Sequence, residues 1–94
     1  MNQAIFVPQS IFKISGEGVV VTGFLKSGVL KPGMFTEIKK QKINIINIEA
    51  FNKKMEEIKE TDLAAKSLAI IVPEGAEKIL TGFINQELIF IESK

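Results

Sequence analysis

The chain of 94 residues contains no cysteine, histidine, arginine, tryptophan or tyrosine. Without cysteine, neither a disulfide framework nor a thiolate metal site can form, which fits a reducing compartment. Without histidine as well, the usual nitrogen and sulfur ligands of zinc are missing, and triads that need an imidazole base cannot be built. Arginine is absent, so the chain has no guanidinium group to contact phosphate or guanine through two hydrogen bonds. The composition therefore predicts a non-enzyme with no catalytic residues, no metal and no cofactor.

Charge of one sign and long apolar runs are also scarce. Twelve lysines face 11 acidic residues, and the net charge of +1 gives no general attraction for a polyanion. No apolar run approaches the ~20 residues that a bilayer span needs, and the start has no basic segment ahead of an apolar block. We expect residues 1–94 to form a single ordered domain without membrane contact, located in the cytoplasm.

Short runs of β-branched or alternating residues predict a protein made of strands. Pro8 should interrupt the first strand, and Gly23 inside the second indicates a bulge or a corner. Residues 31–33, Lys-Pro-Gly, are typical of a type II turn. The expected strands cover residues 4–14, 19–26, 34–39, 43–51, 67–72 and 83–92. Six short strands at fairly regular spacing favour an all-β barrel over alternating βα units.

Two glycine-rich segments carry a resemblance to a known family. The first reads Phe12-x-Ile14-x-Gly16-x-Gly18-x-Val20-Val21-Thr22-Gly23, and the second reads Gly28-x-Leu30-Lys31-x-Gly33. Both resemble the start of domain 2 of elongation factor Tu and related translational GTPases, including the selenocysteine-specific factor. Residues 48–53 and 79–84 are similar to two later motifs of that domain, and the match runs from about residue 6 to residue 91. The resemblance implies an all-β, six-stranded closed antiparallel Greek-key barrel, here without a GTPase domain.

The segment before the fifth strand is harder to interpret. Phe51, Met55 and Ile58 follow helical spacing, and the polar residues among them are good helix formers. The resemblance places a connection there, so we expect residues 52–66 to be a long loop rather than a helix. Residues 74–80 should form at most a short helical turn.

In elongation factor Tu this domain holds the aminoacylated end of tRNA, and four positions carry over by resemblance. Ile14 and Val20 fall on apolar positions of the pocket for the terminal adenosine, and Glu49 falls on the acidic residue beside the sugar. Gly16 falls on the glycine of the family's first turn, where the backbone can be approached closely. These four residues are the candidate RNA-end pocket.

The basic positions of that family do not carry over. Glu17 and Phe24 stand where the bacterial factor has arginines. An acidic side chain at a phosphate-facing position turns attraction into repulsion, and an outward-facing phenylalanine would mark a surface for a protein partner. The three-lysine tip, Lys39, Lys40 and Lys42, is either a solvated hairpin end or a point contact for phosphate.

Nucleotide-binding motifs are missing. The pair Gly16 and Gly18 is followed by Val21 where a dinucleotide fingerprint needs its third glycine. No G-x-x-x-x-G-K-[ST] run occurs, which excludes GTP hydrolysis by this chain.

The sequence predicts a non-catalytic, translation-related docking module. The expected partner is a protein, either a GTPase domain supplied in trans or a ribosomal surface, with Phe24, Lys39, Lys40 and Lys42 as the candidate partner surface. The alternative is a weak RNA-end binder that uses the Ile14, Gly16, Val20 and Glu49 pocket. A homodimer is a further expectation, because the barrel surface that the family covers with a neighbouring domain would here be bare.

Overall fold

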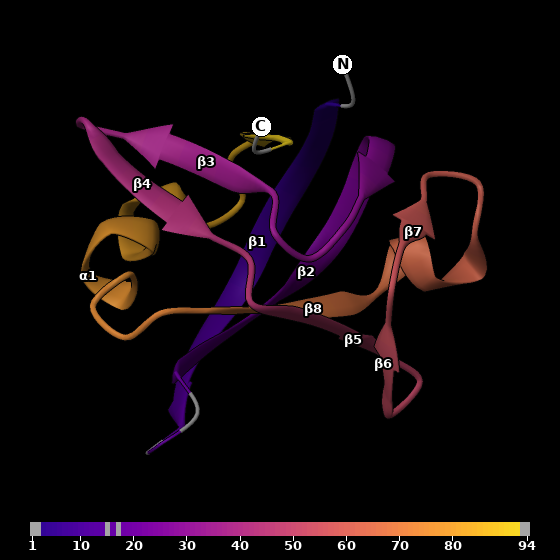
Figure 1. Cartoon of the computed structure of the whole chain (residues 1–94), viewed down its shortest axis with the longest axis horizontal. Helices are drawn as coiled ribbons and strands as arrows, with labels where there is room; N and C mark the ends of the chain where they lie inside the picture. Colours follow the sequence, from indigo (N-terminus) through magenta and orange to yellow (C-terminus); the bar gives the residue numbers. More distant parts are fainter. Residues whose placement is uncertain (1–2, 15, 17, 93–94) are drawn as a thin grey trace.

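The structure is a computed structural model that describes residues 3–14, 16 and 18–92, and this part of the chain consists mainly of β-strands (Figure 1). Its strands are β1 (Gln3–Ile14), β2 (Gly18–Leu30), β3 (Phe35–Ile38), β4 (Gln41–Asn44), β5 (Asn47–Ala50), β6 (Lys53–Met55), β7 (Ile58–Lys59), β8 (Leu68–Val72) and β9 (Leu88–Ile91). Its helical segments are α1 (Glu77–Leu80) and the 3-10 helices η1 (Leu63–Lys66) and η2 (Thr81–Phe83). The predicted all-β class is confirmed. No helix in the described ranges has the length and apolar character that a membrane crossing requires.

The strands pair with antiparallel neighbours in the order β4-β3-β9-β1-β2-β8-β5-β6, and β7 pairs separately with β2. The long strands β1 and β2 run through the middle of the molecule, and the shorter strands curl away from them on both sides (Figure 1). The sheet is thus a curled half-barrel. The strands that come first and last in the sequence are neighbours in the sheet, because Gln3 of β1 is the partner of Ile91 of β9.

The concave side of this sheet holds the hydrophobic core. Residues at alternate positions of the strands point inward, as the pleat requires, and Val19, Val21 and Ile70 are fully buried. The only aromatic side chains among the fully buried residues of the described part are Phe6 and Phe90, whose rings pack edge to face with centroids 6.3 Å apart.

The predicted interruption near Pro8 is confirmed. The register of β1 against β2 shifts between Pro8 and Ser10, directly opposite Gly23. A Cβ atom on Gly23 would lie 2.1 Å from the carbonyl oxygen of Val7 and 2.8 Å from the ring of Phe6. The glycine is therefore required because the two backbones approach closely at the bulge.

The predicted type II turn is also found. Gly33 has a φ of 92°, and the Met34 amide donates to the Lys31 carbonyl at 3.3 Å. The turn between β1 and β2 contains Gly16, with a φ of 82°, whereas Glu17 lies outside the described residues.

The strand expected at residues 43–51 is instead two strands, so that part of the prediction was wrong. Ile45 and Ile48 are both buried although they are an odd number of positions apart, and Ile46 between them is 47% exposed. A continuous strand cannot point both of these side chains to one face, because its side chains alternate with period two. The chain therefore kinks between β4, which pairs with β3, and β5, which pairs with β8.

The expected long loop at residues 52–66 was wrong, and so was the alternative of an α-helix. Phe51 and Asn52 both have positive φ and form a two-residue turn that returns β6 along β5. Ile58 of β7 then pairs with Leu30 and is fully buried. Burial of Ile58 and of Ala64 in η1 holds this segment against the sheet.

The last predicted strand begins later than expected. Phe83 belongs to η2, and Asn85, with a φ of 65°, donates its amide to the Pro8 carbonyl at 2.7 Å, so the strand starts only at Leu88.

The short helical turn expected at residues 74–80 is confirmed by α1. With these changes the described chain has nine strands instead of six, and closure into a six-stranded Greek-key barrel is not confirmed.

Candidate functional site

The convex side of β1, β2, β8 and β5 carries an unusual set of side chains. Because Val19 and Val21 of β2 point into the core, Val20 and Thr22 point outward. The same alternation applies to β8 and β5. The residues that share this side, which we call the outer face, are Ser10, Phe12, Ile14, Val20, Thr22, Asn47, Glu49, Ala69 and Ile71.

An apolar row crosses the outer face. Phe12 lies opposite Val20, Val20 lies opposite Ile71, and Ile71 lies opposite Asn47. Directly opposed side chains have Cβ atoms about 5 Å apart, so the first three form one apolar strip. Phe12 is 56% exposed, and Ile14, two residues further along the same strand, is 40% exposed. The outer face therefore presents the aromatic ring of Phe12 and the branched side chain of Ile14 to solvent.

A polar row runs beside the apolar one. Ser10 lies opposite Thr22, Thr22 opposite Ala69, and Ala69 opposite Glu49. Lys54 of β6 is in turn the partner of Glu49. The charged residues thus lie at one end of the outer face, and its middle carries only small or uncharged side chains.

The structure brings the predicted RNA-end residues to one region without making them neighbours. Ile14, Val20 and Glu49 all belong to the outer face, and Gly16 lies in the turn that joins β1 to β2. Strand β8 separates Val20 from Glu49, so a ligand that touches both must span about 10 Å. Sequence reasoning missed Phe12 and Ile71 as parts of this face. The signal was available in the two-residue spacing of Phe12 and Ile14.

The predicted partner surface is divided between two places. Phe24 is half-buried on β2, whereas Lys39 and Lys40 are exposed in the turn of the β3–β4 hairpin, with φ of 52° and 67°. The amino group of Lys42 lies 4.1 Å from the centre of the Phe35 ring. Because β9 and β1 lie between β3 and β2, Phe24 and the three lysines are not on neighbouring strands.

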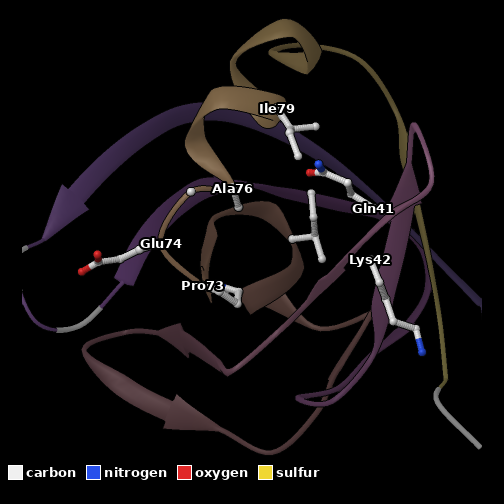
Figure 2. A pocket seen from close by; sticks show the side chains of 8 residues that line it. Gln41, Lys42, Pro73, Glu74, Ala76 and Ile79 are labelled. Carbon is white, nitrogen blue, oxygen red and sulfur yellow. The ribbon is translucent and has the colours of Figure 1, made fainter.

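A pocket of about 220 Å³ lies between β4 and the connection from β8 to α1. We call it the β4 groove; it is lined by Gln41, Lys42, Ile43, Pro73, Glu74, Gly75, Ala76 and Ile79. Figure 2 shows Gln41 and Lys42 on one side of this space and Pro73, Ala76 and Ile79 on the other. The charged groups of Lys42 and Glu74 lie at opposite ends and point away from it (Figure 2). The groove therefore has an apolar floor with one charge of each sign at its rim.

Glu77 has a structural role beside this groove. Hydrogen bonds from its own amide and from the Gly75 amide, the latter at 2.7 Å, lower the pKa of its carboxyl, and Lys13 adds an ion pair at 3.6 Å. A carboxylate held ionised in this way is a poor general base. Within residues 3–14, 16 and 18–92, no three histidine, cysteine or acidic side chains come together as metal ligands.

The fold has a counterpart among solved structures. No model of a known protein family matches the sequence. The apo structure of translation elongation factor SelB from Methanococcus maripaludis matches with a TM-score of 0.67 and 20% sequence identity, covering 97% of this chain and 19% of that protein. At this identity the likeness concerns the fold alone. The protein therefore has the fold of one part of a larger translation elongation factor, and the resemblance predicted from the sequence is confirmed at that level.

Proposed function

We propose that the protein is a non-catalytic, single-domain docking module of the translation machinery and that it binds a protein partner through its outer face. The partner is a GTPase domain supplied in trans or a protein surface of the ribosome. The fold supports the connection to translation, because it matches part of an elongation factor. The observation that carries the proposal is the apolar strip of Phe12, Val20 and Ile71, in which Phe12 is exposed and the other two are half-buried.

The chemistry of the strip suits a protein partner. Interface centres are depleted of charge and enriched in aromatic residues, and Phe12 supplies such a ring on a rigid strand. The Glu49 and Lys54 pair lies at one border of the outer face, where a polar rim is expected. Truncation of a buried aromatic anchor typically weakens an interface by at least about tenfold.

The test is affinity capture from a nuclease-treated lysate of the source cells with three versions of the protein. They are the unchanged protein, Phe12→Ser and Leu63→Ser. Leu63 is a matched control because it is 75% exposed but lies in η1, away from the outer face. We expect a GTPase or a ribosomal protein to be retained by the unchanged protein and by Leu63→Ser, and to be recovered about tenfold less by Phe12→Ser.

Equal capture by all three versions would contradict docking through the outer face. Loss of the partner on nuclease treatment would point to RNA instead. A symmetric dimer over the same face would show as a larger species in sedimentation that Phe12→Ser returns to monomer.

An RNA-end binder is the second candidate. It is favoured by the position of Ile14, Val20 and Glu49 on one face, with the exposed ring of Phe12 available to stack on a base. Binding of a short single-stranded RNA ending in adenosine should then weaken steeply with salt and be lost in Glu49→Ala. Salt-independent binding of a protein, with no effect of Glu49→Ala, would exclude it.

We also infer that the sheet closes into a six-stranded antiparallel Greek-key barrel. Support comes from the kinked segment of β4 and β5, which contacts both ends of the curled sheet. The Ile45 amide donates to the Met34 carbonyl at 2.8 Å, and the next amide, that of Ile46, donates to the Ile71 carbonyl at 2.7 Å. If β4 and β5 act as one bent strand, slow hydrogen exchange is expected at both amides.

A further inference from the structure

Strand β4 has one free edge. It is the first strand in the sheet order, and β3 is its pairing partner. The Ile45 amide bonds on the β3 side, whereas the Ile46 amide bonds to Ile71 of β8. Because successive amides of a strand point to opposite sides, those of Lys42 and Asn44 point to the same side as that of Ile46. That side of β4 opens into the β4 groove.

The groove exists because β8 ends too early to pair with β4. The pairing of β8 with β5 reaches Ile71 opposite Asn47, and β8 ends at Val72. Pro73 follows and has no amide hydrogen to offer, and Gly75, with a φ of 97°, turns the chain toward α1. The space of about 220 Å³ beside Gln41, Lys42 and Ile43 is where a longer β8 would have continued (Figure 2).

We propose that the β4 groove binds an extended acidic segment of a protein partner, which adds to β4 as an antiparallel strand in line with β8. Backbone hydrogen bonds to Lys42 and Asn44 supply the affinity, as in other cases of strand addition to a sheet edge. Side chains at alternate positions of the segment point inward to Ile43 and Ile79, so these should be small and apolar. The remaining side chains point outward, on the side of the exposed Lys42.

We expect the bound segment to be acidic because the β3–β4 hairpin carries three lysines. Lys39, Lys40 and Lys42 are all exposed, and none of them takes part in the ion pairs found between described residues. Lys42 lines the groove, and Lys39 and Lys40 directly precede Gln41, which also lines it, whereas Glu74 lies at the opposite end from Lys42 (Figure 2). Carboxylates on the outward side of the bound segment would meet the lysines and speed its association at low salt.

The test uses a probe peptide with blocked ends in which glutamate and valine alternate over six residues. Titrated into the 15N-labelled protein, it should shift the amide signals of Lys42 and Asn44 in a saturable way, with a Kd of about 1 mM or tighter. The same peptide with N-methylated glutamates lacks the amide hydrogens that face β4, because the outward residues lie directly opposite Lys42 and Asn44, and it should bind at least about tenfold more weakly. A peptide of alternating lysine and valine is the charge control.

Two substitutions at Lys42 distinguish the contribution of its backbone amide to peptide binding from the contribution of its side chain. Lys42→Pro removes both the amide hydrogen that faces the groove and the lysine side chain, at an edge position where proline is tolerated, and should weaken binding about tenfold. Lys42→Ala keeps that amide and should weaken binding only about twofold to threefold. Phe12→Ser on the outer face should leave peptide binding unchanged, so the result does not depend on the proposed docking through that face.

Absence of shifts on β4 at millimolar peptide would overturn the proposal, and so would equal binding of the methylated peptide. Tighter binding of the lysine peptide would overturn the acidic assignment. The methylated peptide is tested on the unchanged protein, so the proposal remains falsifiable even if Lys42→Pro does not fold.

Discussion

Replacement of Gly23 by alanine should destabilise the protein strongly, because the added methyl group has no space. Its carbon would lie 2.1 Å from the Val7 carbonyl oxygen and 3.0 Å from the Pro8 Cα, and both of these are backbone atoms. A real Cβ essentially never comes closer than 3.0 Å to another heavy atom. Rotation of a side chain cannot relieve the overlap with Val7, so β1 and β2 must separate by roughly 1 Å at this point.

The expected loss in the free energy of unfolding is the sum of two contributions. Overpacking that moves backbone costs about 1 to 3 kcal/mol, and distortion of one ladder hydrogen bond adds about 1 kcal/mol. We therefore expect Gly23→Ala to lower the free energy of unfolding by about 3 kcal/mol and the Tm by about 12 to 24 °C in a chain of this size. The total stability of a domain of this length is about 5 to 14 kcal/mol, so the loss is a large part of it.

Far-ultraviolet circular dichroism during urea and thermal unfolding is the suitable assay, because the chain contains no tryptophan or tyrosine for fluorescence. Gly82→Ala is the matched control. Gly82 lies in η2, its φ lies outside the left-handed region, and an added Cβ would have no heavy atom within 4 Å. This substitution should be neutral or stabilising by up to about 1 kcal/mol. A loss below about 1 kcal/mol for Gly23→Ala would refute the argument that the bulge requires glycine.

Two further predictions concern local structure. Lys39 and Lys40 have φ of 52° and 67° in the β3–β4 turn, so the double substitution Lys39→Asn and Lys40→Gly should stabilise the protein by about 1 kcal/mol in urea unfolding. An unchanged or lower stability would contradict the left-handed turn. The pKa of the Glu77 carboxyl is lowered below its ordinary value of 4.5 by amide hydrogen bonds, so its contribution to stability is complete above pH 4.5 and is lost as the pH falls through the lowered value. Glu77→Gln should therefore reduce the stability difference between pH 6 and pH 3 in parallel unfolding curves, and an unaltered difference would contradict this assignment.

The glycine and proline positions account for most of what the sequence could predict. Gly23, Gly33 and Pro8 each force a particular backbone geometry, so the bulge and the type II turn could be placed from local chemistry alone. The all-β class followed from the β-branched runs, which suit a pleated strand.

The errors have a different origin. The kink between Ile45 and Ile48 depends on which neighbours the two halves of the segment pair with, and this is decided by contacts far away in the sequence. In the same way, β7 exists because Ile58 is buried against Leu30. Phe51 and Asn52 both have positive φ, and this turn could not be predicted because neither position is a glycine.

For the candidate sites, the sequence could name residues but not their arrangement. Ile14, Val20 and Glu49 were chosen by resemblance, and only the strand register shows that they share one face and are separated by β8. The spacing of Phe12 and Ile14 indicates that they share a face, but the register shift near Pro8 decides that this face is the outer one. The end of β8 was predicted correctly, because the expected strand at residues 67–72 stops before Pro73, but the position of β4 beside that end is marked by no residue pattern.

The pairing of β1 with β9 has a consequence for how the chain acquires its structure. Contact between Gln3 and Ile91 joins two segments that are far apart in the sequence, so the conformational entropy of all the residues between them must be restricted before this pair can form. Folding dominated by such distant contacts is slow. During synthesis, β1 must wait for β9 to leave the ribosome, and its bare edge, with Ile5 on it, is then a site for misassembly between nascent chains.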